Sequence, residues 1–166
     1  MLTLFLINYL NNMTQKSSIL VCIDVGSGSD IALRYACYKA KKTGFSVHIL
    51  AVIESSYKGL LFASRAVGKD KKMHTEEYIR DLIKKAKEET GIIPTSKIRE
   101  GDIATEIVNE VKEDKDCSMV ILGKSSTSIS DNTVLPVISR KIGNKIKVPL
   151  VVVPENMDKN YLSRLA

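Results

Sequence analysis

The 166-residue sequence has no tryptophan, only three cysteines and no long apolar run. A membrane helix needs about 20 apolar residues, whereas the longest apolar stretches here are residues 19–23, 49–53 and 150–153. The cysteines, at positions 22, 37 and 117, are odd in number and form no C-x-x-C pair. This spacing favours neither a disulfide framework nor a zinc site. We therefore expect a cytoplasmic protein with no membrane segment and no bound metal.

Aromatic residues make up only 5% of the chain, although Lys plus Arg outnumber Asp plus Glu by 25 to 19. A positive balance suits anionic partners, but binding to nucleic acid bases usually needs aromatic side chains near the basic ones. The lysines are spread along the chain, so we interpret them as a solvated surface. The sequence predicts no nucleic acid partner.

Recognisable catalytic motifs are also missing. The two histidines, His48 and His74, stand alone, and neither H-E-x-x-H nor G-x-S-x-G occurs. We expect no catalytic residues and interpret the protein as a non-enzyme.

What the sequence does contain is a regular alternation of short apolar runs with longer amphipathic segments. This pattern is typical of parallel strands connected by helices that cover both faces of the sheet. The length suits a single domain, which we place at residues 17–154. Residues 1–16 are interpreted as a leader, either disordered or preceding a true start at Met13, and residues 155–166 as a short C-terminal tail.

Five strands and four helices are expected within this domain. A capping box at Ser27–Asp30 predicts the start of the first helix, which should end near Gly44. Periodicity is lost between Glu54 and Lys72, where we expect a long loop. The expected strands are residues 19–23, 46–53, 95–99, 118–122 and 150–153. The second helix is expected at residues 73–90, and the third starts at Asp102. A polar loop at 123–133 then precedes the fourth helix, which is marked by Leu135, Ile138 and Ile142.

Such an alternation predicts an open, Rossmann-like α/β sheet, whose ligands bind beyond the carboxyl ends of the strands where the strand order reverses. Asp24 follows the first strand and Gly123 follows the fourth, so both would border that place. Asp24 could accept hydrogen bonds from a ribose or an adenine amine, or could instead cap the turn into the first helix. Gly123 would let the backbone approach a ligand closely.

The turn after the first strand contains Gly26-Ser27-Gly28, which could admit a pyrophosphate at the helix N-terminus. The third glycine of a dinucleotide fingerprint would fall at Ile31, so a Rossmann dehydrogenase is not expected. An adenylyl-transferring enzyme built on this turn is the least favoured hypothesis.

Five segments taken together resemble the universal stress protein family. The resemblance covers about Ser17 to Pro154 and depends on the order and spacing of the segments. They are ILVCID at 19–24, AVIE at 51–54, GDIATEIV at 101–108, DCSMVILG at 116–123 and VPLVVVP at 148–154. This resemblance implies a five-stranded parallel sheet of order 3-2-1-4-5.

In the ATP-binding branch of that family, the fourth strand is followed by G-x-x-G, nine residues, and then G-S or G-T. Gly123 matches the first glycine, but the other motif positions hold Ser126, Pro136 and Val137. Proline has no backbone N–H to donate and valine has no hydroxyl, so two phosphate contacts of the family are missing. The resemblance therefore implies weak or absent ATP binding.

The positions that match the family's base and ribose contacts are Asp24, Val52, Gly123 and Ile138. Lys124, with nearby hydroxyls such as that of Ser126, could meet an anionic group, or this segment could be a solvated loop. ATP or AMP thus stays a possible ligand.

The resemblance further implies a homodimer in which the last strands pair at their edges through Leu150, Val151, Val152 and Val153. The favoured function is a non-catalytic, cytoplasmic stress-response protein that acts as this dimer and through other protein partners. The alternative is an adenine-nucleotide sensor or very slow ATPase with a modified phosphate loop.

Overall fold

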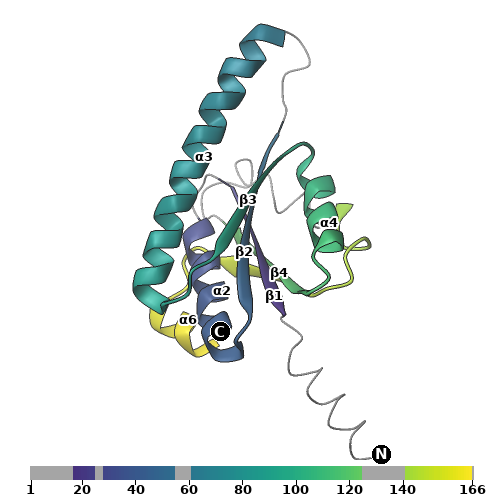
Figure 1. The fold of residues 1–166 in the computed structure, drawn as a ribbon. Helices are drawn as coiled ribbons and strands as arrows, with labels where there is room; N and C mark the ends of the chain where they lie inside the picture. Colours follow the sequence, from purple (N-terminus) through teal and green to yellow (C-terminus); the bar gives the residue numbers. More distant parts are fainter. Residues whose placement is uncertain (1–16, 25–27, 55–60, 125–140, 166) are drawn as a thin grey trace, which may run out of the picture.

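The computed structural model describes residues 17–24, 28–54, 61–124 and 141–165. They form one parallel sheet with helices on both faces (Figure 1). The elements in chain order are β1 (Ser18–Ile23), α2 (Ser29–Thr43), β2 (Ser46–Ile53), α3 (Leu61–Thr90), β3 (Thr95–Glu100), α4 (Ile103–Glu113), β4 (Cys117–Lys124), β5 (Leu150–Pro154) and α6 (Lys159–Leu165).

The strand order is β3-β2-β1-β4-β5, which confirms the expected order. All four pairings are parallel, and β1 lies between β2 and β4, as the pairs Cys22↔Leu50 and Cys22↔Leu122 show. β2 and β3 lie on one side of β1, and β4 and β5 lie on the other, so the strand order reverses between β1 and β4. The carboxyl ends of these two strands are therefore neighbours.

Alternate residues of each strand build two separate cores, because successive side chains of a strand point to opposite faces. Ile19, Val21 and Ile23 of β1 pack on the face that α2, α3 and α6 cover. Leu20 and Cys22 pack on the other face, against α4. Burial on both faces explains why β1 reads as a continuous apolar run.

The first helix does not begin with the expected capping box. Its N-cap is Gly28, whose φ of 101° lies in the left-handed region, and no side chain caps the helix. Glycine adopts this backbone conformation without a steric cost. The predicted end is confirmed, because Gly44 closes α2 with its N–H bound to Ala40 O.

The expected loop at 54–72 is wrong over much of its length. α3 begins at Leu61, twelve residues before the predicted start at Met73, and continues to Thr90. Of the apolar stripe that the periodicity predicts for this helix, Ile79, Leu82 and Ala86 are buried, whereas Ile83 is half-buried. The N-terminal half of α3 projects beyond the ends of the strands (Figure 1). No sheet lies against it there to require apolar side chains at regular spacing.

The segment after β5 is more than the short tail that we expected. It forms helix α6, whose Leu162 has no exposed surface and packs in the core on the α2 face. The helix is only seven residues long, and a single buried leucine cannot produce the repeated apolar spacing by which a helix is recognised in a sequence.

The remaining differences concern β4 and the segment after it. β4 extends to Lys124, so Gly123 and Lys124 belong to the strand and not to the predicted loop. Of the expected fourth helix, Leu135 and Ile138 lie outside the described residues, whereas Ile142 is fully buried against the α4 side. The leader at 1–16 also lies outside them. Within the part of the chain described, no helix is long and apolar enough to span a membrane.

Candidate functional site

Asp24, which follows β1, and Gly123, near the carboxyl end of β4, both adjoin the start of α2. The last registered pair between these strands is Cys22↔Leu122, and Gly28 and Ser29 at the start of α2 pack against the same place. We call these four residues, Asp24, Gly28, Ser29 and Gly123, the Asp24 corner. It lies where an open α/β sheet of this order binds its ligands.

Asp24 is fastened to α2 by a hydroxyl. Ser29 Oγ donates to the backbone O of Asp24 at 2.8 Å and lies 3.1 Å from its carboxylate Oδ1. Ser29 itself is only 2% exposed, so its hydroxyl needs these acceptors. The arrangement agrees with the interpretation in which Asp24 secures the turn into the first helix. The other carboxylate oxygen of Asp24, Oδ2, does not take part in the Ser29 hydrogen bond.

Gly123 is required by the protein's own backbone. A Cβ atom at this position would lie no more than 3.0 Å from Gly28 O, Gly28 C and Ser29 N. Real Cβ atoms essentially never come so close to backbone atoms. The space that we expected Gly123 to leave for a ligand is therefore filled by the first residues of α2.

The other predicted site residues are less closely gathered. Val52 follows Ala51, the partner of Ile23 in β1, and is half-buried against the α4-side core. Lys124 is the last residue of β4, in register with Pro154. Ser126 and Ile138 lie outside the described residues, and so do Pro136 and Val137.

Tyr78 reaches the Asp24 corner from α3, although no sequence motif pointed to it. Its hydroxyl is within hydrogen-bonding reach of the Ser29 side chain, and the ring is half-buried against the core. Burial raises the pKa of Tyr78, and the carboxylates of Asp24 and Asp30 add to this rise, whereas the Ser29 bond opposes it. Tyr78 is thus close to both carboxylates.

An ion-pair network holds α3 against α2 near this corner. Arg34 on α2 pairs with Asp30 at 3.0 Å and with Glu89 on α3, and Tyr38 donates to Glu89 at 2.9 Å. The Arg34 side chain is only 13% exposed. Because these contacts fix the lower half of α3, the position of Tyr78 is fixed as well.

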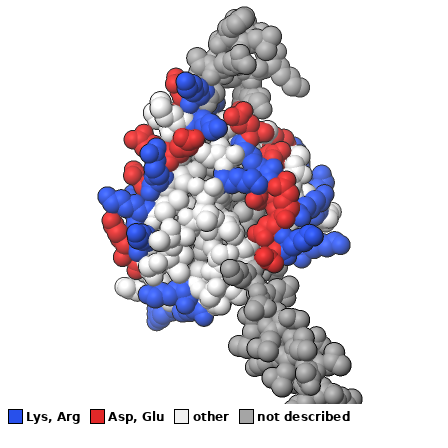
Figure 2. Space-filling view, viewed as in Figure 1, with Lys and Arg blue, Asp and Glu red and all other residues white. Residues whose placement is uncertain are grey.

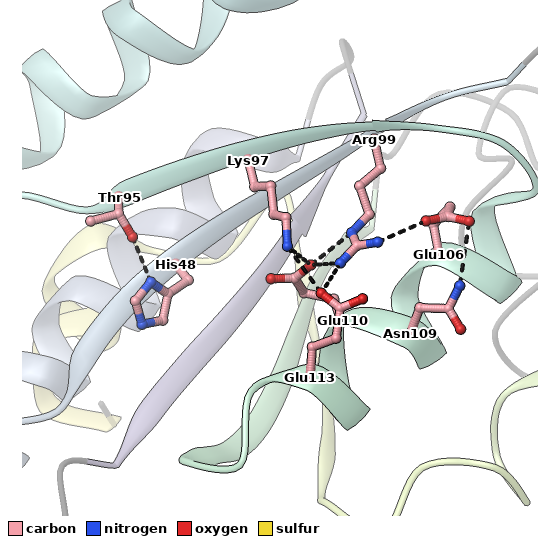
Figure 3. Close-up of polar contacts among 8 residues, drawn as sticks. All are labelled: His48, Thr95, Lys97, Arg99, Glu106, Asn109, Glu110 and Glu113. Atoms are coloured by element: carbon pink, nitrogen blue, oxygen red, sulfur yellow. Dashed lines mark hydrogen bonds and ion pairs between the residues drawn. The ribbon is translucent and has the colours of Figure 1, made fainter.

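A second charged cluster joins β3 to α4 and has a structural role (Figure 3). Arg99 donates from Nε to Glu110 at 2.7 Å and from Nη1 to Glu106 at 3.2 Å, and it also pairs with Glu113. Arg99, followed by Lys97, lowers the pKa of Glu113. Because each carboxylate faces a cation, the cluster serves to hold β3 against α4 and does not resemble a catalytic acid–base pair.

Figure 2 shows charged side chains gathered over α3 on one side and over the β3–α4 edge on the other. Lysine on an exposed edge strand hinders pairing with another sheet. On β3 this lysine is Lys97, whose side chain is 49% exposed. Its Nζ also pairs with Glu110 at 2.9 Å. The polar sequence of β3 suits an edge position, and the strand order places β3 at the edge of the sheet.

The three cysteines are buried and free. Burial raises the pKa of Cys37 to about 12 and that of Cys117 to about 11, and it raises the pKa of Cys22 further still. A thiol must ionise before it attacks as a nucleophile. These thiols therefore act as small apolar core residues. Among the residues described, no three His, Cys, Asp or Glu side chains are grouped to hold a metal ion.

The fold and the corner define a class of protein: a single-sheet, Rossmann-like α/β protein with its polar groups at the β1–β4 switch point. A model of the universal stress protein family matches residues 17–154, so the chain belongs to that family. The search of curated proteins returned no match.

Solved structures of this family share the fold at low sequence identity. The universal stress protein UspA of Lactobacillus plantarum has a TM-score of 0.70 at 14% identity, covering 82% of this chain and 97% of its own. A universal stress protein from Archaeoglobus fulgidus in complex with dAMP has a TM-score of 0.56 at 14% identity, covering 84% and 98%. One solved with cAMP has a TM-score of 0.58 at 13% identity, covering 82% and 95%.

Proposed function

We propose that this chain is a non-catalytic, cytoplasmic stress-response protein that acts as a homodimer and through other proteins, with weak or absent ATP binding. Its membership of the universal stress protein family supports the general role. The observation that carries the dimer is that, among the described residues, β5 ends the sheet.

β5 ends the sheet and has β4 as its only strand partner among the described residues. Val152 is 41% exposed, and Leu150 and Val151 are half-buried. Val153 is only 1% exposed, so its side chain belongs to the protomer's core, and only its backbone is available at the edge. An apolar edge strand with open backbone groups is a template for a second strand. A second copy of β5 would cover it with the same residues from both sides.

Replacing Val152 with aspartate is expected to convert the dimer to monomers, because the interface would then bury an unpaired carboxylate from each copy. Size-exclusion chromatography with light scattering measures the change. Ile93→Asp is the matched control, since Ile93 is 63% exposed but lies between α3 and β3. A wild-type protein that is monomeric at all concentrations, or a Val152→Asp variant that stays dimeric, would reject this interface.

Weak ATP binding is supported by the sequence after β4 and by the packing of Gly123. Pro136 and Val137 stand where the family's ATP-binding members have a glycine and a hydroxyl. Gly123 keeps the motif's first glycine, but the start of α2 occupies the space beside it. Catalysis finds no support in the described thiols or in the β3–α4 charge cluster.

A second candidate function is an adenine-nucleotide sensor. Two solved relatives contain dAMP or cAMP, and the Asp24 corner occupies the switch point of this chain's sheet. Asp24 has one carboxylate oxygen outside the Ser29 bond, which could accept from a ribose hydroxyl or an amine.

For this second candidate, isothermal titration calorimetry with AMP and Mg²⁺-ATP should give micromolar binding that falls about tenfold or more in Asp24→Ala, since a charge-assisted hydrogen bond contributes about 1.5–3 kcal/mol. Asp81→Ala is the control, because Asp81 is an exposed carboxylate on α3. If neither nucleotide gives heat with the wild-type protein, the sensor is rejected and the non-binding dimer remains.

A further inference from the structure

The upper half of α3 extends past the protein body. Thr75, Ile79, Leu82 and Ala86 form a buried stripe, but every side chain from Lys69 to His74 is exposed. The inward stripe continues upward from Thr75 to positions 71 and 72, four and three residues earlier, and both are lysines. The apolar stripe thus becomes basic in the N-terminal half of α3. That half of the helix extends past the carboxyl ends of the strands (Figure 1).

Lys71 shares a helix face with Tyr78, which touches the Asp24 corner. Residues seven apart lie two turns apart on one side of a helix, here about 10 Å along the axis. Thr75 lies between them on that face, is 4% exposed, and donates from Oγ1 to Lys71 O at 2.8 Å. Lys71 therefore lies two turns before Tyr78 on the same face, and its long side chain leans toward the N-terminus of α3.

The charge of the corner makes a cation at this place useful to a nucleotide. Asp24 and Asp30 both lie near Tyr78, and of these two carboxylates Arg34 pairs with that of Asp30. The phosphate of a nucleotide held by Asp24 would meet negative charge, and Pro136 and Val137 stand where the family has its phosphate-binding glycine and hydroxyl. A lysine above the corner would offset that repulsion.

We propose that Lys71 binds the phosphate of an adenine nucleotide whose nucleoside is held at the Asp24 corner. This inference rests on the second candidate function and names the group that compensates for the phosphate contacts that Pro136 and Val137 cannot make. Lys72, also exposed and next to it, adds positive charge but lies on a more distant side of the helix from Tyr78.

The test compares AMP with adenosine by calorimetry in the full-length protein and in two variants. We expect the wild type to bind AMP more tightly than adenosine, and Lys71→Gln to lose about three- to tenfold in AMP affinity while adenosine affinity is unchanged, as for one partly solvated ion pair. Lys85→Gln is the matched control: Lys85 is exposed and lies seven residues after Tyr78 on the same face, two turns farther from the strand ends.

The outcomes separate the inference from the function beneath it. If AMP and adenosine bind equally, or if Lys71→Gln and Lys85→Gln reduce AMP affinity alike, the role of Lys71 is overturned while nucleotide binding stands. If neither ligand binds the wild type, the sensor function falls and the inference falls with it. Since both lysines are exposed, neither substitution should alter folding, which thermal unfolding verifies.

Discussion

Gly123→Ala is expected to lower the free energy of unfolding by at least about 3 kcal/mol. The added Cβ would press on Gly28 O, Gly28 C and Ser29 N, which are backbone atoms and cannot move aside as a flexible side chain does. β4 lies inside the sheet, paired with β1 and β5, so the strand cannot shift without breaking a ladder. Urea unfolding followed by circular dichroism measures the loss, and suits a chain without tryptophan.

Gly44→Ala separates this clash from the general cost of replacing glycine. Gly44 has a φ of +76°, but a Cβ there would meet nothing within 4 Å. Its replacement should cost only about 1–2 kcal/mol from left-handed backbone strain. If Gly123→Ala proves no more damaging than Gly44→Ala, β4 and the start of α2 do not pack closely enough to require a glycine.

This result would bear on the family motif itself. A glycine at the end of the fourth strand reads as a phosphate-binding residue, yet in this chain it has a packing role that is sufficient to require it. Retention of Gly123 is therefore no sign that the ATP site is retained. A loss of nucleotide binding in Gly123→Ala would also be uninformative, which is why the binding tests use Asp24 and Lys71.

The sheet could be predicted because burial on both faces leaves a strong signal. Runs such as 19–23 and 150–153 are apolar without interruption. A helix was rightly expected to start at Asp102, which caps α4 by accepting from Thr105 N at 3.0 Å. The strand order followed from the resemblance as well as from the alternation. Local patterns of this kind are visible because each depends on residues close in sequence.

The upper part of α3 and the full Asp24 corner were not predictable in the same way. Gly68 and the charged run at 69–72 interrupt the apolar period by which helices are recognised, so residues 61–72 looked like a loop. Asp24 was identified from its place after β1, but Tyr78 comes from α3 and reaches Ser29 only through the packing of α3 on α2. Contacts of this range leave no trace in a single sequence.

The C-terminal helix α6 gives the other large expected effect. Leu162→Ala should lower the free energy of unfolding by about 2–4 kcal/mol, because truncating a buried leucine removes apolar contacts and leaves a cavity. Leu162 has no exposed surface and lies in the same core as α2 and Val153. Chemical denaturation measures the loss.

Tyr161→Ala is the control for Leu162→Ala, since Tyr161 is the preceding residue of α6 but is 47% exposed. Among the described ring contacts, its ring has one, with the guanidinium carbon of Arg164 at 5.7 Å. Its loss should cost less than about 1 kcal/mol. Equal effects would mean that α6 is a detachable tail, as its sequence suggested. A large difference would make α6 part of the cooperative core, placed directly after the edge strand β5 through which we expect two copies to pair.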